Sequence, residues 1–389
     1  MDELIKRLNA KTKEERLEAL CELKQLADEK RFDFPENDGN VNNHIHTTFS
    51  FSPYSPAKAI YMARMSKLSV AGIIDHDSVG GITEFREAGR ILGLPTTAGF
   101  ELRVGFEDTP LKGRRINNPD QNDVAYMAIH GLAGSKLAAA ESFLRPIGAA
   151  RAGRNRKMCA RLTEITGIKL DYDTDVLPLS EKRYGGSVTE RHLLCALSLK
   201  LIGIYGKDRE LRDKLLTYPG FTPETVGKLT DPDDTLFLYD LIGILKSGFI
   251  DFVYLPAGKD ECPRVQELVR FAKDTDSILA YAYLGDVTDS VTGDKKAQTF
   301  EDSWIEELFE VLNELGIKAI TYMPARNTRE QLERVRNMCE RYDILQISGE
   351  DINSPRQPFV SKASKDPYFA NLKETTWKLI EHENKEETK

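Results

Sequence analysis

The histidines of this chain stand beside short apolar segments, where they could share a metal ion. His44 and His46 close the run 41–46, two positions apart. On a β-strand, residues two apart point to the same face, so both imidazoles would aim at one point, as metal binding requires. A pair of hydrogen-bonded strand histidines fits the same spacing. The H-x-H pattern alone therefore leaves the metal site undecided.

A second apolar run, residues 72–77, ends in three ionisable side chains, Asp75, His76 and Asp77. A buried strand that ends this way needs partners for those groups, because an unpaired buried charge is costly. The simpler alternative is a turn in which Asp77 caps the following helix, since two glycines come soon after it. That alternative accounts for Asp77 but leaves His76 without a role.

Later apolar runs also end in metal-capable side chains, namely Glu101, His130, and the pair Asp351 and Asn353. Gly99, two residues before Glu101, suggests a close approach of backbone or ligand. In parallel β/α folds the functional site lies at the carboxyl ends of the strands. The repetition favours convergence on one metal centre over coincidence. His192 follows a helix start at Thr189 and, taken alone, is explained as an ordinary core or surface histidine.

From residue 40 onward, strand-like runs alternate with helical patterns. The strand-like runs cover residues 70–74, 124–129, 252–255, 278–283, 317–322 and 344–347. The helical patterns cover residues 56–67, 83–92, 303–315 and 328–342. This alternation predicts an α/β protein with a parallel sheet or barrel and crossover helices on its outside.

The same patterns divide the chain into five segments. These are an N-terminal helical arm (1–39), a first part of the barrel (40–133), a mostly helical insertion carrying His192 (134–250), a second part of the barrel (251–360) and a C-terminal tail (361–389). The insertion is expected to roof one end of the barrel. The polar end of the tail is expected to be frayed.

The composition is that of a globular protein, with 389 residues of which 40% are hydrophobic and 30% charged. The net charge of −8 argues against a protein that tracks duplex nucleic acid, which usually has a basic excess. The five cysteines form no C-x-x-C pair and are expected to be reduced thiols. No apolar leader and no stretch of about 20 apolar residues appears. We therefore expect a cytoplasmic protein that does not cross a membrane.

Several ordered motifs together resemble the PHP domain, the polymerase and histidinol phosphatase superfamily. They are the segments 44–48 (HIHTT), 75–78 (DHDS) and 99–101 (GFE). His130, the Arg191-His192 helix start and the Asp351-x-Asn353 ending fit the later motifs of that family. The resemblance covers roughly residues 40–360. It implies a distorted, TIM-like, seven-stranded (β/α) barrel that holds two or three clustered metals.

The resemblance also assigns ligands. His44, His46, Glu101 and Asp351 would hold one metal, and Glu101 would bridge to a second metal held by His130 and His192. His76 would belong to a third site. Residues 49–53 lack the ligand that similar chains carry there, and Asn353 stands where a histidine is usual. We therefore predict two divalent ions (Zn, Mn or Fe), with a third site weak or absent.

The predicted activity is hydrolysis of a phosphate ester by a hydroxide that bridges two metals. The substrate would be a small phosphorylated molecule, either a phosphomonoester or a short nucleotide. His76 or Asp75 would protonate the leaving alkoxide. Asn353 and the arginines Arg326 and Arg356 would contact the phosphate, although surface arginines in loops explain both positions equally well.

Two other functions remain open from the sequence. One is a nuclease that acts on single-stranded or terminal nucleotides. The other is a non-catalytic module in which the metal supports folding or docking. The overall acidity and the bulky insertion favour a small substrate over the nuclease. The retention of all six ligands of the two-metal site argues against the non-catalytic module. The oligomeric state cannot be inferred from the sequence.

Overall fold

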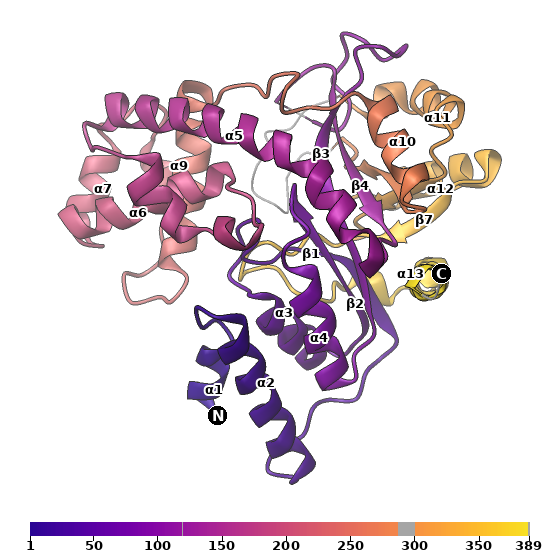
Figure 1. The fold of residues 1–389 in the computed structure, drawn as a ribbon. Helices are drawn as coiled ribbons and strands as arrows, with labels where there is room; N and C mark the ends of the chain where they lie inside the picture. The colour runs from indigo at the N-terminus through magenta and orange to yellow at the C-terminus, as the bar shows by residue number, and fades with distance from the viewer. Residues whose placement is uncertain (119, 287–299, 388–389) are drawn as a thin grey trace.

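The computed structural model describes residues 1–118, 120–286 and 300–387, and within them a seven-stranded sheet forms the centre of the molecule (Figure 1). The strands are β1 (Asn40–Ile45), β2 (Leu68–His76), β3 (Thr96–Gly105), β4 (Val124–His130), β5 (Ile278–Tyr283), β6 (Ala319–Tyr322) and β7 (Leu345–Ser348). They pair in sequence order. The ring is nearly closed where Ile352, after β7, exchanges backbone hydrogen bonds with His44 and His46 at 3.1 and 3.0 Å. The predicted distorted seven-stranded barrel is thus confirmed.

One strand departs from the parallel arrangement that the sequence predicts. β4 runs antiparallel to both of its neighbours, β3 and β5, whereas the remaining pairs are parallel. The described residues of the connection, 106–118 and 120–123, contain no crossover helix, and the chain turns back beside β3 as a long-looped hairpin. Alternating apolar runs do not reveal such a reversal, because strand direction leaves no mark on the burial pattern.

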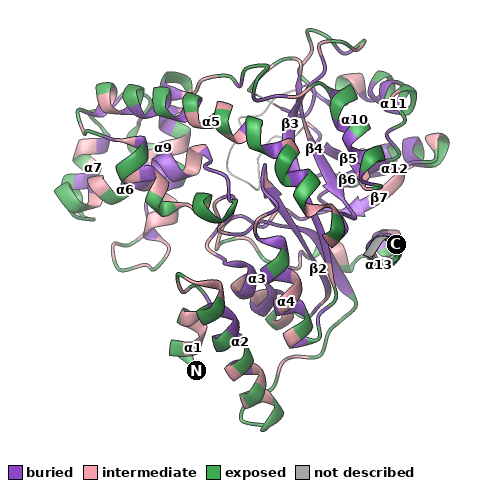
Figure 2. Cartoon of the chain, viewed as in Figure 1, coloured by how far each residue is buried: buried purple, intermediate pink, exposed green. Residues whose placement is uncertain are grey.

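Helices cover the barrel. They are α3 (Pro56–Met65), α4 (Ile82–Leu92), α10 (Val265–Asp274), α11 (Ile305–Glu314) and α12 (Arg329–Tyr342). The predicted N-terminal arm forms α1 (Asp2–Arg7) and α2 (Lys13–Asp28); α2 packs on α3 and α4, and α1 packs on α2. A buried ion pair joins α2 to α4, with Arg16 Nη2 2.5 Å from Glu84 Oε2. The strands are almost wholly buried, and the outer faces of the helices are exposed (Figure 2).

The predicted insertion is a helical unit with a core of its own. It contains α5 (Leu137–Thr166), α6 (Glu190–Tyr205), α7 (Arg209–Leu215), α8 (Pro223–Gly227) and α9 (Phe237–Val253). Residues 252–255 were predicted to be a strand. Instead, residues 252–253 end α9, and residues 254–255 follow it without regular structure. Leu241, Leu245, Phe249 and Val253 are buried at intervals of four, which is helical spacing that a four-residue window cannot show.

The C-terminal segment, predicted to be a tail, contains α13 (Ala370–Glu387), which packs against β1, β3 and β7. Asn43 donates a hydrogen bond of 2.7 Å to the Thr376 hydroxyl, and Glu383 accepts the backbone N–H of Ala98 at 2.8 Å. α13 therefore packs on the barrel through residues up to Glu383, and residues 388–389, at the polar end of the tail, lie outside the described part of the chain. Among the described residues, no helix has the length and apolar character needed to cross a membrane.

Candidate metal centre

The structure brings His44, His46 and Glu101 together at one end of the barrel. The three side chains are buried, and one potential ligand atom from each lies within 4.8 Å of the others. His44 Nε2 is 3.5 Å from Glu101 Oε2, and His46 Nε2 is 3.4 Å from Glu101 Oε1. The H-x-H pair at the end of β1 thus faces the carboxylate from β3, as the sequence predicted.

Asp351, from the loop after β7, lies beside His46 but outside the group of three, whose ligand atoms are all within 4.8 Å of one another. Its Oδ1 lies 3.3 Å from His46 Nε2. Burial by itself would raise the pKa of Asp351, but the neighbouring His46 holds that pKa below its usual range. Burial opposes ionisation of Glu101 in the same way, yet His76 and His44 hold the pKa of Glu101 well below its usual range. Both carboxylates are therefore ionised and available as metal ligands.

These spacings fit a bound cation. Ligand atoms about 2.0–2.2 Å from a tetrahedral zinc stand roughly 3.3–3.6 Å from one another, and the three separations between the imidazoles and the carboxylates are 3.3, 3.4 and 3.5 Å. Within the described part of the chain, the buried Nε2 atoms of His46 and His130 have no hydrogen-bond partner. Buried polar nitrogens of this kind call for a ligand.

The imidazole of His46 is oriented by a short hydrogen-bonded chain. Its Nδ1 lies 3.2 Å from the Ser50 hydroxyl, which donates to Asp75 Oδ1 at 2.6 Å. The backbone N–H and the hydroxyl of Thr47 also donate to Asp75, each at 2.7 Å. Both oxygens of Asp75, one of the two predicted proton donors, are thus engaged with the loop 47–50. The contacts of Asp75 fix His46 so that Nε2 faces Glu101.

His130, a predicted ligand of the second metal, ends the neighbouring strand β4 and lies outside the group of His44, His46 and Glu101. Glu101 pairs with Ala128 across the antiparallel ladder, so His130, two residues further along β4, lies on the same face as Glu101. Burial lowers the pKa of His130 to about 3, with His44 adding to the effect and Glu101 opposing it. His130 is consequently a neutral imidazole, the form that binds metals.

His192, the other predicted ligand of a second metal, lies outside the group of His44, His46 and Glu101. It is buried near the start of α6, where its Nδ1 accepts the backbone N–H of Thr189 at 3.0 Å. Burial lowers the pKa of His192 to about 3, so the ring is neutral and its hydrogen is on Nε2. In this arrangement neither ring nitrogen offers a lone pair to a metal.

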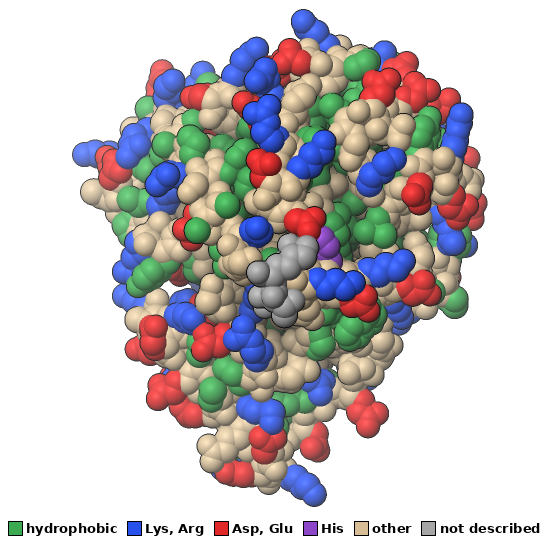
Figure 3. All heavy atoms as spheres, turned by 45° about the vertical axis from the view of Figure 1, so that its right-hand side comes forward, with side chains coloured by type: hydrophobic (Ala, Val, Ile, Leu, Met, Phe, Trp, Pro, Cys, Tyr) green, Lys and Arg blue, Asp and Glu red, His purple; other side chains and the backbone are tan. Residues whose placement is uncertain are grey.

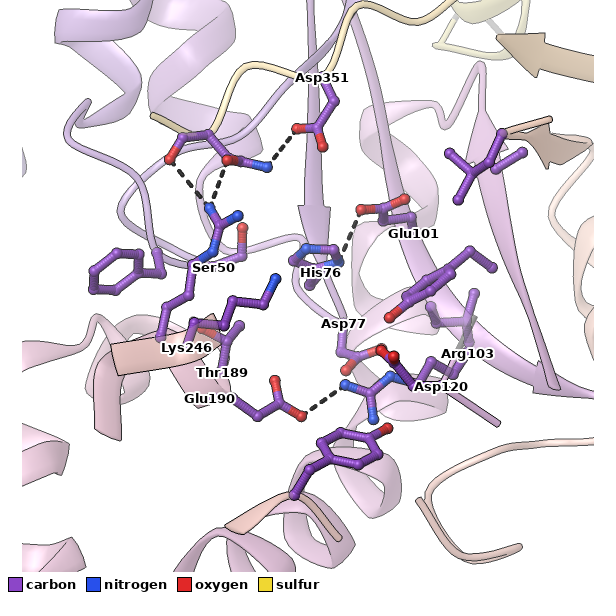
Figure 4. Close-up of a pocket in the computed structure, with 18 of the residues that line it drawn as sticks. Ser50, His76, Asp77, Glu101, Arg103, Asp120, Thr189, Glu190, Lys246 and Asp351 are labelled. Carbon is purple, nitrogen blue, oxygen red and sulfur yellow. Dashed lines mark hydrogen bonds and ion pairs between the residues drawn. The ribbon is translucent and has the colours of Figure 1, made fainter. Parts of the chain in front are cut away.

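His76 lies beside the group and opens onto the pocket (Figure 4). Its Nδ1 is 2.8 Å from Glu101 Oε1, and about a third of its side chain, 32%, is exposed. The ring is thus anchored through one nitrogen to a candidate metal ligand. A single anchored imidazole at a pocket wall is suited to proton transfer.

Asn353 links Asp351 to the insertion. Its Nδ2 donates to Asp351 Oδ1 at 2.7 Å, and its Oδ1 accepts a hydrogen bond of 2.5 Å from Arg191 on α6. The sequence placed Asn353 at the site, but it singled out Arg191 only as the neighbour of His192. The proximity of Arg191 to the closing Asp-x-Asn segment depends on tertiary structure alone.

The two arginines predicted to contact phosphate have different surroundings. Arg326 is buried and lines the pocket, with its Nε donating to the backbone oxygen of Leu284 at 3.0 Å. Arg356 is exposed and binds Asp240 on α9 through two hydrogen bonds of 2.7 and 2.5 Å. Arg326 is therefore placed to meet a substrate, whereas Arg356 ties its loop to the insertion.

A second set of charges at the pocket is not evident from the sequence. We call it the arginine–carboxylate cluster; its members are Arg103, Arg151, Arg154, Asp77, Glu190 and Glu261. Glu261 is 3.0 Å from Arg151 Nε and 2.6 Å from Arg154 Nε. α5 and α6 contribute three of these residues, and the barrel and the loop before α10 contribute the others, so the cluster fastens the insertion to the barrel.

The fold is shared with two solved structures of low sequence identity. A protein from Bifidobacterium adolescentis, assigned provisionally as a metal-dependent phosphoesterase, aligns with a TM-score of 0.57 and 19% identity over 90% of this chain and 98% of that one. An amidohydrolase from Chromobacterium violaceum, solved with bound sulfate and no metal, aligns with a TM-score of 0.54 and 17% identity over 86% of this chain and 96% of its own. No protein-family model matches the chain, and no curated protein matches it in sequence. The likeness establishes the fold.

Proposed function

We propose that this protein is a metal-dependent hydrolase of phosphate esters. The observation that carries the proposal is the buried group of His44, His46 and Glu101, in which both imidazoles lie within 3.5 Å of the carboxylate. Support comes from the shared fold, because one protein with this fold is assigned provisionally as a phosphoesterase and the other binds sulfate, a tetrahedral anion like phosphate.

His44, His46, Glu101 and Asp351 would hold the first metal, and Glu101 would extend to a second, with His130 and a reoriented His192. Zinc, manganese and iron all suit such mixed ligands. A divalent metal pair supplies an activated water and stabilises charge on the phosphoryl oxygens. The neutral state of His130 and the ionised states of Glu101 and Asp351 prepare these residues to bind cations.

The remaining residues would orient the ester and handle its proton. Arg326, from the loop after β6, and Arg191, from α6, line the pocket and carry the positive charge that phosphate requires. His76 contacts Glu101 through Nδ1 and lines the pocket, where it would donate a proton to the leaving alkoxide. Asp75 is not placed for that step, because its oxygens already accept hydrogen bonds from Thr47 and Ser50.

A small substrate fits the surface better than a long nucleic acid does. Basic and acidic side chains are interspersed over the face drawn in Figure 3, and a histidine is visible among them. Proteins that track nucleic acid usually gather basic residues on one face. The interspersed charge therefore favours a compact phosphorylated molecule as the substrate.

The proposal is tested by metal content and hydrolysis measured on the same samples. We expect the purified protein to bind at least one divalent ion per chain and to hydrolyse p-nitrophenyl phosphate when manganese is added. Glu101→Gln should remove both properties, because it replaces the carboxylate shared by His44 and His46. His382→Asn, on α13, serves as the control. Bound metal with no hydrolysis of p-nitrophenyl phosphate, mononucleotides or short oligonucleotides would instead indicate a non-catalytic metal module.

A further inference from the structure

The backbone oxygen of Leu284 holds Arg326 at the pocket. Leu284 directly follows β5, and it lines the same pocket as Arg326. Its carbonyl accepts the Nε–H of Arg326 at 3.0 Å and the side-chain amide of Asn327 at 2.7 Å. A guanidinium is planar, so a hydrogen bond to Nε fixes the plane in which its other nitrogens lie. The position of this one carbonyl therefore sets the direction in which Arg326 faces.

The backbone around Leu284 is held in turn by the carboxylate of Glu301, which precedes α11. Glu301 Oε2 accepts the backbone N–H of Leu284 at 3.0 Å and that of Gly285 at 2.5 Å. Glu301 Oε1 accepts the hydroxyl of Tyr281, on β5. Glu301 is 1% exposed, and a buried carboxylate needs hydrogen bonds in place of its hydration. These three donors fix both of its oxygens.

One peptide group connects Glu301 to Arg326. The N–H of Gly285 and the carbonyl of Leu284 belong to the same planar trans peptide, so they point in opposite directions. Glu301 accepts the N–H on one side, and Arg326 donates to the carbonyl on the other. An acceptor on the N–H also polarises the carbonyl, and hydrogen bonds in such a chain strengthen one another by about 10–30%. Glu301 therefore acts on Arg326 through both position and charge.

The surrounding contacts hold this peptide closely. Gly285 has a φ of +68°, and a Cβ atom built there would lie 2.3 Å from Asn327 Nδ2, so the turn depends on glycine. The contact with residues 300–301 is also reciprocal, because Asp286 Oδ1 accepts the backbone N–H groups of Phe300 and Glu301 at 2.9 and 2.8 Å. The turn after β5 and the segment before α11 thus fix each other.

We infer that Glu301 is a positioning residue for the phosphate of the substrate, because it fixes the peptide that directs Arg326 at the pocket. The inference rests on the proposed function, in which Arg326 contacts the phosphate. A purely structural role for Glu301 is the alternative. In that case the loss of its carboxylate would lower the stability of the fold and leave the KM of the folded protein unchanged.

Steady-state kinetics with p-nitrophenyl phosphate test the inference. Glu301→Ala should raise KM about tenfold, the worth of one hydrogen bond, and should change kcat much less. Glu301→Gln should restore KM to nearly the wild-type value, because its amide oxygen can accept both backbone N–H groups while its NH2 group donates to Tyr281. Glu306→Ala, at an exposed position of α11, is the control for the loss of charge. A wild-type KM in Glu301→Ala would overturn the inference.

A double-mutant cycle separates positioning of Arg326 from a general loss of structure. Arg326→Met removes the guanidinium and should raise KM about 10- to 100-fold. If Glu301 acts through Arg326, adding Glu301→Ala to Arg326→Met should raise KM by less than about twofold more. Additive effects of the two changes would overturn the inference. If the alanine variant does not fold, Glu301→Asp takes its place in the cycle, because it keeps the charge and withdraws the oxygens by one methylene group.

Binding of inorganic phosphate to the metal-free protein distinguishes this inference from the proposed function. We expect calorimetric titration to show about tenfold weaker binding in Glu301→Ala, with no further loss when the change is added to Arg326→Met. That result without any hydrolysis by the metal-loaded protein would support the positioning role and refute the hydrolase. Hydrolysis of p-nitrophenyl phosphate, with wild-type KM and phosphate affinity in Glu301→Ala, would support the hydrolase and refute the positioning role.

Discussion

The side-chain amide of Asn353 donates a hydrogen bond of 2.7 Å to Oδ1 of Asp351, a candidate metal ligand. Asn353 in turn accepts a hydrogen bond of 2.5 Å from Arg191 on α6. The insertion therefore contacts the metal centre through one intermediary residue. Because one oxygen of Asp351 is fixed by the amide and faces His46, this contact sets the orientation of the carboxylate. Residues that orient a metal ligand in this way commonly affect affinity about 10- to 100-fold.

Asn353→Ala should therefore weaken metal binding about tenfold without unfolding the protein. The physical reason is that Asp351 loses the hydrogen bond that holds its carboxylate toward His46. Competition with a chromogenic chelator measures the affinity, and Asn313→Ala on α11 is the matched control. Arg191→Ala should cause a smaller loss, because it acts on Asp351 only through Asn353. Wild-type affinity in Asn353→Ala would show that the contact has no bearing on metal binding.

Replacement of His76 should affect substrates according to their leaving groups. His76→Gln removes the proposed proton donor, which should slow alkyl phosphate hydrolysis about 100-fold or more. p-Nitrophenyl phosphate should lose much less, because p-nitrophenolate departs without a proton. The metal content should stay at the wild-type level, since the proposed ligands are intact. Equal losses for both substrates would assign His76 to metal or substrate binding rather than to proton transfer.

The arginine–carboxylate cluster should make stability depend on pH through Glu261. Burial alone would raise the pKa of Glu261, but the hydrogen bond from Arg154 and the charges of Arg151 and Arg103 hold that pKa below its ordinary value of 4.5. A group whose pKa is lowered by folding stabilises the protein above its unfolded pKa and loses that contribution as the pH falls. Its contribution should thus be complete above about pH 4.5 and diminish in more acidic solution.

Glu261→Gln tests this linkage. We expect the variant to lose about 3 kcal/mol or more of unfolding free energy at pH 7, because three buried guanidinium groups lose a charged partner. Below pH 4.5 the difference from the wild type should shrink, as the wild-type carboxyl also becomes neutral. Urea unfolding at a series of pH values measures both effects. Glu340→Gln, at an exposed pair on α12, should show no such pH-dependent difference.

The sequence predicted those parts of the site that depend on local patterns. His44 and His46 follow from the two-residue spacing on a strand, and Glu101 follows from its place at the end of an apolar run. The arginine–carboxylate cluster could not be predicted in this way, because Arg103, Arg154 and Glu261 meet only after the insertion folds onto the barrel. The reversal of β4 could not be predicted either, because a hairpin and a crossover connection can join equally apolar strands.

Gly99 is the local signal whose physical meaning the structure makes explicit. A Cβ atom built on Gly99 would lie 1.8 Å from the backbone oxygen of Ile129, so only glycine allows β3 and β4 to pair at this level. Gly99→Ala should push the strands apart and cost about 3 kcal/mol of stability. Because Glu101 and His130 flank this point on the two strands, metal affinity should fall as well. Gly153→Ala is the control: it is exposed on α5 with open space around the added atom, and it should stabilise the protein by about 0.5–1 kcal/mol. Urea unfolding of the metal-free protein and chelator competition measure the two effects, and wild-type values for Gly99→Ala would contradict the close approach.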